Sequence, residues 1–429
     1  MKRHVTVIRD PVHGDMEIPS ALLTLTDTRE FQRLRGVRQL GTASFVYPGA
    51  VHTRFDHSLG TCWLAGRLLD RLKPEIKTQH RLATLAWALL HDVTHIPYGH
   101  TLEDERRVFD RHDTEERVKN GLPQGELGKA LSKLKLLDPL LEIALDGSRW
   151  EHQLTSSAIA ADLLDYLARD AFFCGLTQRY DGRIFSLFGL DKGRLFLDAQ
   201  WDGVVRQDAL SEIIHLLRIR YFLSERVYFH HTKTVSGAMV SRAVEEAMKH
   251  GLTLPEIAKR TDEGLLDLLE STYGEQPVVA RLIGALRSRR LYKRVYLLTA
   301  ELPEERRLHF VDLFHKDAQR RSHAESELAK RCKLSSEDLI VYCPALKMQL
   351  KEGKVPVKVD SGPPRGLDEL PVDEIGILKE RHRLLWRFYV FLNPAKMAKA
   401  DSLALACEDY FGESNHLPRY RSGQLFLGV

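Results

Sequence analysis

The stretch RLATLAWALLHDVTHIPYGHTLE at 81–103 constrains this chain most, because an apolar helical pattern ends there in a cluster of ionisable groups. Residues 82–90 are apolar on nearly every helical face, which predicts a helix buried on all sides. The ionisable residues that follow are His91, Asp92, His95 and His100. Imidazole and carboxylate groups are ligands for divalent metals, and His91 and His95 would share one face if the helix continued. The pattern therefore predicts a metal-binding or proton-transfer site.

A lone His-Asp pair is weak evidence for a metal site, because a chain with 19 histidines and 59 acidic residues forms such pairs by chance. His112-Asp113 is a second pair in this chain. Two more positions strengthen the pattern: His57 opens a predicted helix that runs to Leu72, and Asp162 lies on a predicted helix at 156–173.

Ionisable residues recur on the 156–173 helix at spacings of three and four, beside apolar residues. A carboxylate stripe that enters a core is costly unless it meets a metal, arginines or hydroxyl groups. We expect Asp165 and Arg169 to form a structural pair, and Asp162 to face a site.

Five motifs carry a resemblance to a known family: DPVHGDMEIP, DTREFQRLRGVRQLG, YPGAVHTRFDHSLG, HDVTHIPYGHTLEDE and DLLDYLARD. In this order they resemble the deoxynucleoside triphosphate (dNTP) triphosphohydrolases of the HD-domain superfamily. That group includes bacterial dGTPase-like enzymes and the human enzyme that joins a sterile alpha motif to an HD domain. The resemblance covers about residues 5–235, with fainter similarity around 281–345.

The resemblance implies a divalent metal on two histidines and two aspartates, His57, His91, Asp92 and Asp162. Such a set leaves positions open on an octahedral ion, which favours Mn²⁺, Mg²⁺, Fe²⁺, Ni²⁺ or Co²⁺ over a closed tetrahedral zinc site.

Further roles are implied by the same resemblance. The catalytic candidates are His95, His100, Glu103, His112 and Arg54. The candidates for substrate binding are Gln39, Leu40, Arg54, Tyr166, Asp170, Arg220 and Tyr228. Leu40 would lie where a ribose 2′-hydroxyl would clash, and Asp27 and Arg35 would hold an activator nucleotide.

Simpler interpretations stay open for several of these residues. Arg54 could form a surface ion pair with Asp56, His112 could lie on an exposed surface, and Tyr228 could be a core residue. The arginines of 20–39, Arg35 among them, could form a solvated helix face.

This chain departs from the family pattern at three positions. Arg9 and Thr6 stand where some members have Asn and Lys in the activator site. Leu163 follows Asp162, where members commonly place a Lys or Arg against the substrate phosphates. The cations that could replace it are Arg220, Arg226 and the basic run at 287–294.

The net charge of +4 is too small for strong generic nucleic-acid binding, although the run at 287–294 could bind a regulatory nucleotide or a nucleic-acid backbone. The five cysteines form no CxxC pair, which indicates a reducing compartment. No signal-peptide pattern is present, and no run approaches the roughly 18 apolar residues of a membrane span. We therefore expect a cytoplasmic protein without membrane association.

The fold expected is mainly α: an HD-domain core at 1–280 and a smaller C-terminal α/β lobe with a helical tail at 281–429. The predicted elements are a short strand or hairpin at 1–19, helices in 20–39, 208–250 and 253–289, strands at 292–300 and 337–346 with a helix at 309–332 between them, an exposed loop at 358–371, and a helical pair at 374–391 and 395–411.

We expect a metal-dependent phosphohydrolase that converts dNTPs to deoxynucleoside and triphosphate, acting as a dimer or tetramer. One alternative is an HD phosphohydrolase for a monophosphate, a signalling nucleotide or a nucleic-acid end. A non-catalytic regulator that binds nucleotide or nucleic acid is the other.

Overall fold

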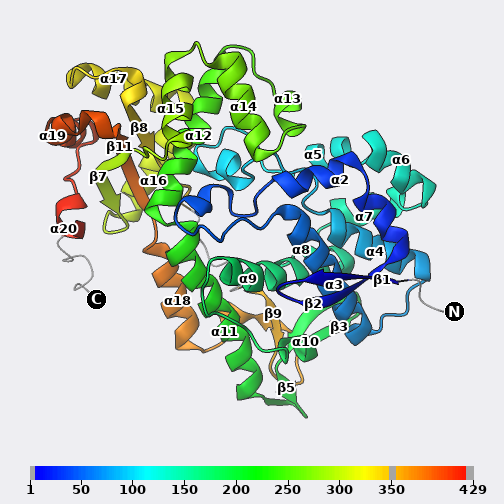
Figure 1. The fold of residues 1–429 in the computed structure, drawn as a ribbon. Helices are drawn as coiled ribbons and strands as arrows, with labels where there is room; N and C mark the ends of the chain where they lie inside the picture. The colour runs from blue at the N-terminus through cyan, green and yellow to red at the C-terminus, as the bar shows by residue number, and fades with distance from the viewer. Residues whose placement is uncertain (1–4, 347–353, 422–429) are drawn as a thin grey trace.

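The computed structural model describes residues 5–346 and 354–421, and most of them lie in helices (Figure 1). At the N-terminus, β1 (Val5–Asp10) and β2 (Gly14–Pro19) form the predicted antiparallel hairpin. Asp10 closes its turn by accepting hydrogen bonds from the amides of Val12 and His13 at 2.9 and 2.8 Å. This turn fixes the position of His13.

Helices that surround α3 (Arg54–Leu72) make up the first half of the fold. The others, in chain order, are α1 (Ser20–Thr26), α2 (Arg29–Gln32), η1 (Arg33–Gly36), η2 (Gly41–Phe45), α4 (Thr78–Leu90), η3 (Thr101–Glu105), α5 (Glu115–Gly121), α6 (Gly125–Lys133), α7 (Leu137–Leu145), α8 (Trp150–Ser156) and α9 (Ala161–Phe173). α3 packs between α4 and α9. The second half of α4 is buried, as its all-round apolar pattern predicts.

The predicted helix at 156–173 begins later, at Ala161. Ser157 donates its hydroxyl to the Ile159 carbonyl at 3.1 Å, and Ala160 is extended, so local bonding replaces the first helical turn. Asp162 therefore lies in the first turn of α9, where the helix dipole favours a negative charge.

A second group of helices follows a set of short strands. In chain order the elements are α10 (Ile184–Leu187), β3 (Phe188–Asp191), β4 (Arg194–Asp198), β5 (Gln200–Trp201), β6 (Val204–Val205), α11 (Gln207–Leu223), η4 (Ser224–Tyr228), α12 (His231–Lys249), α13 (Leu254–Ala258), α14 (Asp262–Tyr273) and α15 (Pro277–Arg287). The helices expected in 208–250 and 253–289 are thus present.

The C-terminal lobe contains a three-stranded antiparallel sheet in the order β7-β11-β8. Its strands are β7 (Lys293–Thr299), β8 (Leu339–Tyr342) and β11 (Arg387–Leu392). Its helices are α16 (Glu304–Phe310), η5 (Val311–His315), α17 (Ala318–Arg331), η6 (Ser336–Asp338), α18 (Asp373–Arg383), η9 (Pro394–Lys399), α19 (Ala400–Phe411) and α20 (Leu417–Arg421). The strands predicted at 292–300 and 337–346 are confirmed.

The helix predicted at 374–391 is wrong in its second half. α18 ends at Arg383, and β11 becomes the central strand of the sheet. The sequence RFYVFL is rich in aromatic and β-branched residues, whose strand propensity and burial on both faces outweigh the helical spacing before it. The helix predicted at 309–332 is also interrupted, because α16, η5 and α17 share that stretch.

The segment after β8 returns to the N-terminal half. β9 (Pro356–Lys358) pairs in parallel with β4, and β10 (Arg365–Gly366) and η8 (Leu367–Glu369) follow it. Val357 and Leu367 are fully buried in the N-terminal core, so the loop expected at 358–371 is only partly exposed. The division of the chain at residue 280 stays a prediction.

Buried ion pairs join the N-terminal half to the C-terminal lobe. Arg106, just after η3, donates to Glu325 on α17 at 2.9 Å and to Glu245 on α12 at 2.6 Å. Arg321 donates to the Arg106 carbonyl at 3.0 Å and also binds Glu245. Because these charges are buried, each depends on its partners, and α17 is held against the segment that contains η3.

The five cysteines are buried and unpaired. Within 5–346 and 354–421, no helix combines the length and the apolar character that crossing a bilayer requires.

Candidate metal and active site

Three chain segments bring the predicted metal ligands together. His57 lies in the first turn of α3, His91 and Asp92 directly follow α4, and Asp162 lies in the first turn of α9. His57 Nε2 is 3.0 Å from Asp162 Oδ1 and 3.7 Å from Asp92 Oδ2. His91 Nε2 is 3.5 Å from Asp92 Oδ1 and 3.8 Å from Asp162 Oδ1. The four side chains predicted as ligands therefore converge on one point.

The donor atoms fit a divalent cation. His91 Nδ1 is engaged by the Ala88 carbonyl at 2.9 Å, and the buried Nε2 has no hydrogen-bond partner among the described residues. His57 Nδ1 is likewise engaged by Asp165, so both rings direct Nε2 to the cluster. Burial disfavours a charge on His57, but hydrogen bonds and charges of Asp162 and Asp165 outweigh it and raise the pKa of His57 to about 10. The same negative charges would hold a metal cation.

Asp165 orients the His57 ring from behind. Its Oδ2 is 2.7 Å from His57 Nδ1, and its Oδ1 is 2.7 Å from His13 Nε2. Arg169 donates to both oxygens at 2.9 Å and to Asp10 at 2.8 Å. Burial disfavours the Asp165 charge, but Arg169 and the imidazoles lower the pKa of Asp165 well below its usual value. The predicted pair of Asp165 and Arg169 is present, and His13 and Asp10 are additions that sequence reasoning missed.

Arg54 lies next to the predicted metal ligands and is almost fully buried. Its Nη1 donates to Asp92 Oδ2 at 2.5 Å, while Nε and Nη2 have no hydrogen-bond partner among the described residues. A surface pair with Asp56 does not form, because Asp56 accepts from the amide and hydroxyl of Thr53 in a capping box. Gly99 leaves room for the guanidinium, since a Cβ there would lie 2.5 Å from Nη2.

A second cluster adjoins the first through Asp92. The rings of His95 and His112 stack with centroids 3.4 Å apart, and the nearest nitrogen of each lies 3.3 and 3.5 Å from Asp92 Oδ1. Glu103 Oε2 is 3.0 Å from His100 Nδ1 and 3.2 Å from His112 Nδ1. His112 is buried, so the exposed-surface interpretation is wrong. Burial, with the charges of Arg54 and His112, lowers the pKa of His95 well below its usual value.

His91 and His95 do not share a helix face, because α4 ends at Leu90 and turns follow. Arg33 donates to the carbonyls of Val93 and His95 at 3.1 and 2.6 Å, which removes these acceptors from helical pairing. Pro97 has no amide hydrogen to donate to the Val93 carbonyl. The turn, rather than a helix, places His95 beside Asp92.

Four predicted substrate residues lie together where α9 meets α11 and η4. Tyr228 donates its hydroxyl to Asp170 Oδ2 at 2.7 Å, and the Arg220 guanidinium is 5.6 Å from the Tyr166 ring centre. His52, which sequence reasoning missed, is 2.8 Å from Asp170 Oδ1. The backbone amide of Gln39 donates to the His52 carbonyl at 3.0 Å, which places Gln39 and Leu40 near this group.

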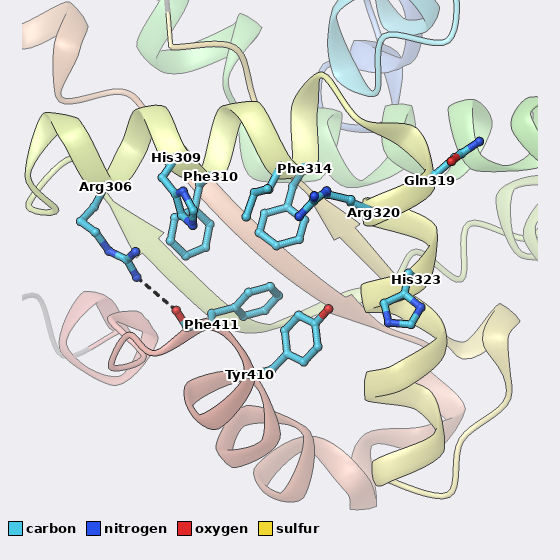
Figure 2. A pocket seen from close by; sticks show the side chains of 10 residues that line it. Arg306, His309, Phe310, Phe314, Gln319, Arg320, His323, Tyr410 and Phe411 are labelled. Carbon is cyan, nitrogen blue, oxygen red and sulfur yellow. Dashed lines mark hydrogen bonds between the residues drawn. The ribbon is translucent and has the colours of Figure 1, made fainter.

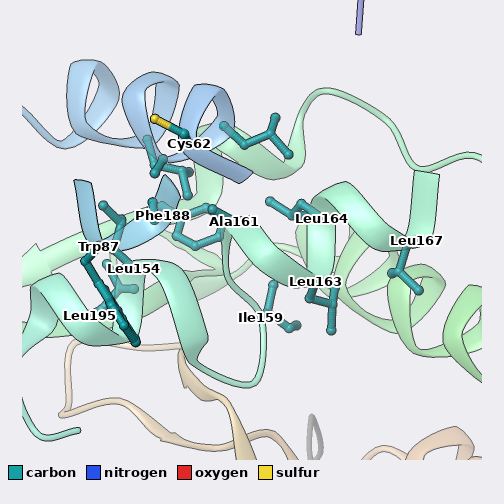
Figure 3. Packing of buried hydrophobic residues seen from close by; sticks show 14 of the residues in the cluster. Cys62, Trp87, Leu154, Ile159, Ala161, Leu163, Leu164, Leu167, Phe188 and Leu195 are labelled. Carbon is teal, nitrogen blue, oxygen red and sulfur yellow. The ribbon is translucent and has the colours of Figure 1, made fainter. Parts of the chain in front are cut away.

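The remaining predicted positions lie elsewhere. Arg35 packs its guanidinium 3.6 Å from the Phe55 ring centre and donates to Gln32 at 2.8 Å. Asp27 caps the end of α1, and no hydrogen bond or ion pair joins it to Arg35 in the described chain. Leu163 is buried in the apolar core with Leu164 and Leu167 (Figure 3), and does not face the metal ligands.

Two protein-family models and two solved structures match this chain. The chain matches the HD domain family over residues 54–170 and the HD associated region family over residues 191–415. The solved structure of a hypothetical protein from Aquifex aeolicus has a TM-score of 0.69 at 22% identity and covers 93% of this chain and 99% of its own. A phosphohydrolase from Bacteroides thetaiotaomicron has a TM-score of 0.64 at 22% identity and covers 90% and 99%. These two likenesses show the fold.

Curated relatives have similar sequences over part of their length. An uncharacterized protein of Methanocaldococcus jannaschii is 30% identical and covers 61% of this chain and 54% of its own. The deoxynucleoside triphosphate triphosphohydrolase SAMHD1 homolog of Dictyostelium discoideum is 28% identical, covering 67% and 60%. SAMHD1 of Bos taurus is 27% identical, covering 78% and 65%. The chain thus spans between half and two thirds of these relatives, and because the HD associated region alone matches more than half of it, the chain belongs to the family of HD-domain proteins that carry this region.

Proposed function

We propose that this chain hydrolyses dNTPs to deoxynucleoside and triphosphate. The observation that carries the proposal is the position of Asp92, which lies between the metal-ligand histidines, the Arg54 guanidinium and the His95–His112 pair. A site for phosphoryl chemistry needs a cation, a phosphate-binding arginine and a proton-handling group around one reacting centre.

His57, His91, Asp92 and Asp162 would hold the divalent ion, which we expect to be Mn²⁺, Mg²⁺, Fe²⁺, Ni²⁺ or Co²⁺. When bound, such an ion makes water more acidic and draws charge from a phosphoryl group. Asp165 keeps the Nε2 atom of His57 directed at the ion, because it holds the opposite nitrogen of the ring.

Arg54 supplies the phosphate contact. Its Nε and Nη2 atoms, which have no partner among the described residues, can donate to oxygens of the α-phosphate, while Asp92 fixes the guanidinium in place. His95 stays neutral near pH 7, so one ring nitrogen can accept a proton while the other donates to a phosphate oxygen. Glu103 orients His112 and His100 behind His95, through contacts with their Nδ1 atoms.

Deoxyribose would lie against Gln39, Leu40 and the Tyr166–Asp170–Tyr228 group. The Gln39 side-chain oxygen is buried without a partner among the described residues and could accept from the 3′-hydroxyl. Leu40 would exclude a 2′-hydroxyl by its bulk. An activator nucleotide at Asp27 and Arg35, and assembly into a dimer or tetramer, belong to the proposal by resemblance to SAMHD1-type relatives.

The buried position of Leu163 favours a second candidate function, hydrolysis of a smaller nucleotide. Without a cation after Asp162, the protein has one positive charge fewer near the phosphates of a bound triphosphate. A monophosphate carries less negative charge and needs fewer cations for binding. In the first proposal Arg220 or Arg226 supplies the missing charge.

Product analysis tests both candidates. Purified protein is incubated with Mn²⁺ and a panel of dNTPs, NTPs and monophosphates, and the products are resolved by chromatography. Release of intact triphosphate from dNTPs supports the first candidate, whereas turnover of monophosphates alone supports the second. Asp92→Asn should lose both bound metal and turnover, while Asp113→Asn, half-exposed beside His112, should keep them. Full activity and metal content in Asp92→Asn would refute the site.

A further inference from the structure

The C-terminal lobe contains a cavity of about 550 Å³ between α16, η5, α17 and α19 (Figure 2). Its floor is aromatic: the rings of Phe310, Phe314 and Phe411 lie 5.3 to 5.8 Å apart, and Tyr410 extends the group at 5.1 Å from Phe411. No residue that lines it belongs to the candidate active site.

The rim of the cavity consists of nitrogen-bearing side chains. His309, Gln319 and His323 have no side-chain hydrogen bond or ion pair within residues 5–346 and 354–421, and all three are exposed. Arg320 forms an ion pair with Asp317 at 3.4 Å, but the two side chains are 66% and 40% exposed. Such a pair contributes little stability, so the guanidinium is available to a ligand.

The two halves of the lining restrict the ligand. A purely apolar molecule would desolvate the polar rim without bonding to it, and a free phosphate would leave the aromatic floor unused. A nucleobase stacks on aromatic rings, and its phosphate accepts paired hydrogen bonds from arginine. We propose that this cavity binds a nucleotide, with the base on the partly exposed ring of Tyr410 at the edge of the buried Phe310–Phe314–Phe411 group and the phosphate at Arg320 and His323.

The helix that presents the phosphate-binding side chains is held in place. Arg320 and His323 are three residues apart on α17, and therefore lie on one helix face. Arg321 points the other way, into the buried ion pairs with Glu245 and the Arg106 carbonyl. The opposite end of the cavity is fixed as well, because Arg306 donates to Glu413 at 2.6 Å. The site is thus largely preformed, as small-molecule sites usually are.

A free mononucleotide and one nucleotide of a single-stranded nucleic acid share this chemistry. The proposal does not depend on the reaction that the HD site catalyses. The full chain is photolabelled with 8-azidoadenosine 5′-monophosphate, and the labelled peptides are mapped by mass spectrometry. Labelling should fall within 306–323 or 400–411, and should persist in the Asp92→Asn protein. Competition by AMP or by a short oligoadenylate then shows whether the cavity prefers a free mononucleotide or a single-stranded nucleic acid.

Arg320→Ala should reduce this labelling at least about tenfold, because charge-assisted hydrogen bonds to the phosphate are lost. Lys330→Ala, which removes another exposed cation from the same helix, should leave it unchanged. Label found only on peptides of the HD site, or equal labelling of the cavity in Arg320→Ala and the unchanged chain, would overturn the proposal.

Discussion

The guanidinium of Arg54 lies 2.5 Å from the carboxylate of Asp92, and both side chains are buried. This contact fixes the proposed phosphate-binding arginine beside a proposed metal ligand. The guanidinium of Arg54 donates from Nη1 to Asp92, and its Nε and Nη2 atoms have no partner among the described residues.

Arg54→Lys should keep the positive charge but lose the fork. A single ammonium cannot bind Asp92 and the substrate oxygens in the same geometry, so kcat should fall by about 10²- to 10³-fold. Metal content, measured by elemental analysis, should stay unchanged. Arg67→Lys on the same helix, where Arg67 packs on Trp63 and Phe185, is the matched control. Undiminished kcat in Arg54→Lys would contradict the assigned role.

His13→Phe should weaken metal binding by about tenfold, because Asp165 loses one of the hydrogen bonds that hold it against His57. An aromatic ring is kept at this position, so packing on Trp63 is retained. Titration with Mn²⁺ measures the affinity. His80→Phe, which breaks a contact with Glu151 away from the metal ligands, should leave the affinity unaltered. Equal affinities in all three proteins would show that His13 does not support the site.

Leu40→Ala should relax the exclusion of ribonucleotides. We expect the chain to prefer dGTP over GTP, and removal of this bulk should reduce the ratio of their kcat/KM values by about 10- to 100-fold. Steady-state kinetics on both nucleotides measures the ratio. Equal kcat/KM for dGTP and GTP in the unchanged chain would refute this part of the proposed function.

Leu163→Lys should destabilise the fold rather than tighten triphosphate binding. The side chain is 3% exposed within the apolar core, and an unpaired ammonium there costs several kcal/mol, about 3 or more. Thermal unfolding measures the effect, with Leu405→Lys as the control because Leu405 is 67% exposed on α19. A stable Leu163→Lys protein with tighter dNTP binding would show that the lysine reaches the phosphates instead.

Asp262 predicts a pH dependence of stability. It accepts hydrogen bonds from the amides of Arg38 and Tyr98 at 3.0 and 2.7 Å, but burial raises its pKa from 3.8 to about 6. The folded state therefore holds the proton more tightly than the unfolded state, and ionised Asp262 destabilises the fold as the pH rises through 4 to 6.

Asp262→Asn removes this titration. The free energy of unfolding of the unchanged chain, relative to this variant, should fall by about 3 kcal/mol as the pH rises through this window. Urea unfolding of both proteins at pH 4 and pH 7.5 measures the difference, and a difference independent of pH would refute the assignment.

The convergence of the four proposed metal ligands could be anticipated from the family resemblance and from the way His91 and Asp92 end the apolar pattern of α4. The residues that support these side chains could not be predicted from the sequence. His13 lies 152 residues from Asp165, and His52 lies 118 residues from Asp170, so no local spacing signals either pair. Arg33 appears in the sequence as one more surface arginine, although it binds the carbonyls of Val93 and His95 in the turns that follow α4.

Tertiary contacts also explain why the helix predicted over the residues of β11 was wrong. The residues before Arg387 follow a helical spacing, and only pairing with β7 and β8 on both sides makes a strand the stable choice.

The strand order β7-β11-β8 has a consequence for biosynthesis. β7 and β8 flank the centre of the sheet but precede β11 in the chain, so neither can pair until residue 392 has left the ribosome. Until then both strands expose unpaired edges, which are templates for aggregation. The lobe should therefore close late during translation, and a ribosome stalled before Arg387 should present a nascent chain that requires chaperone protection.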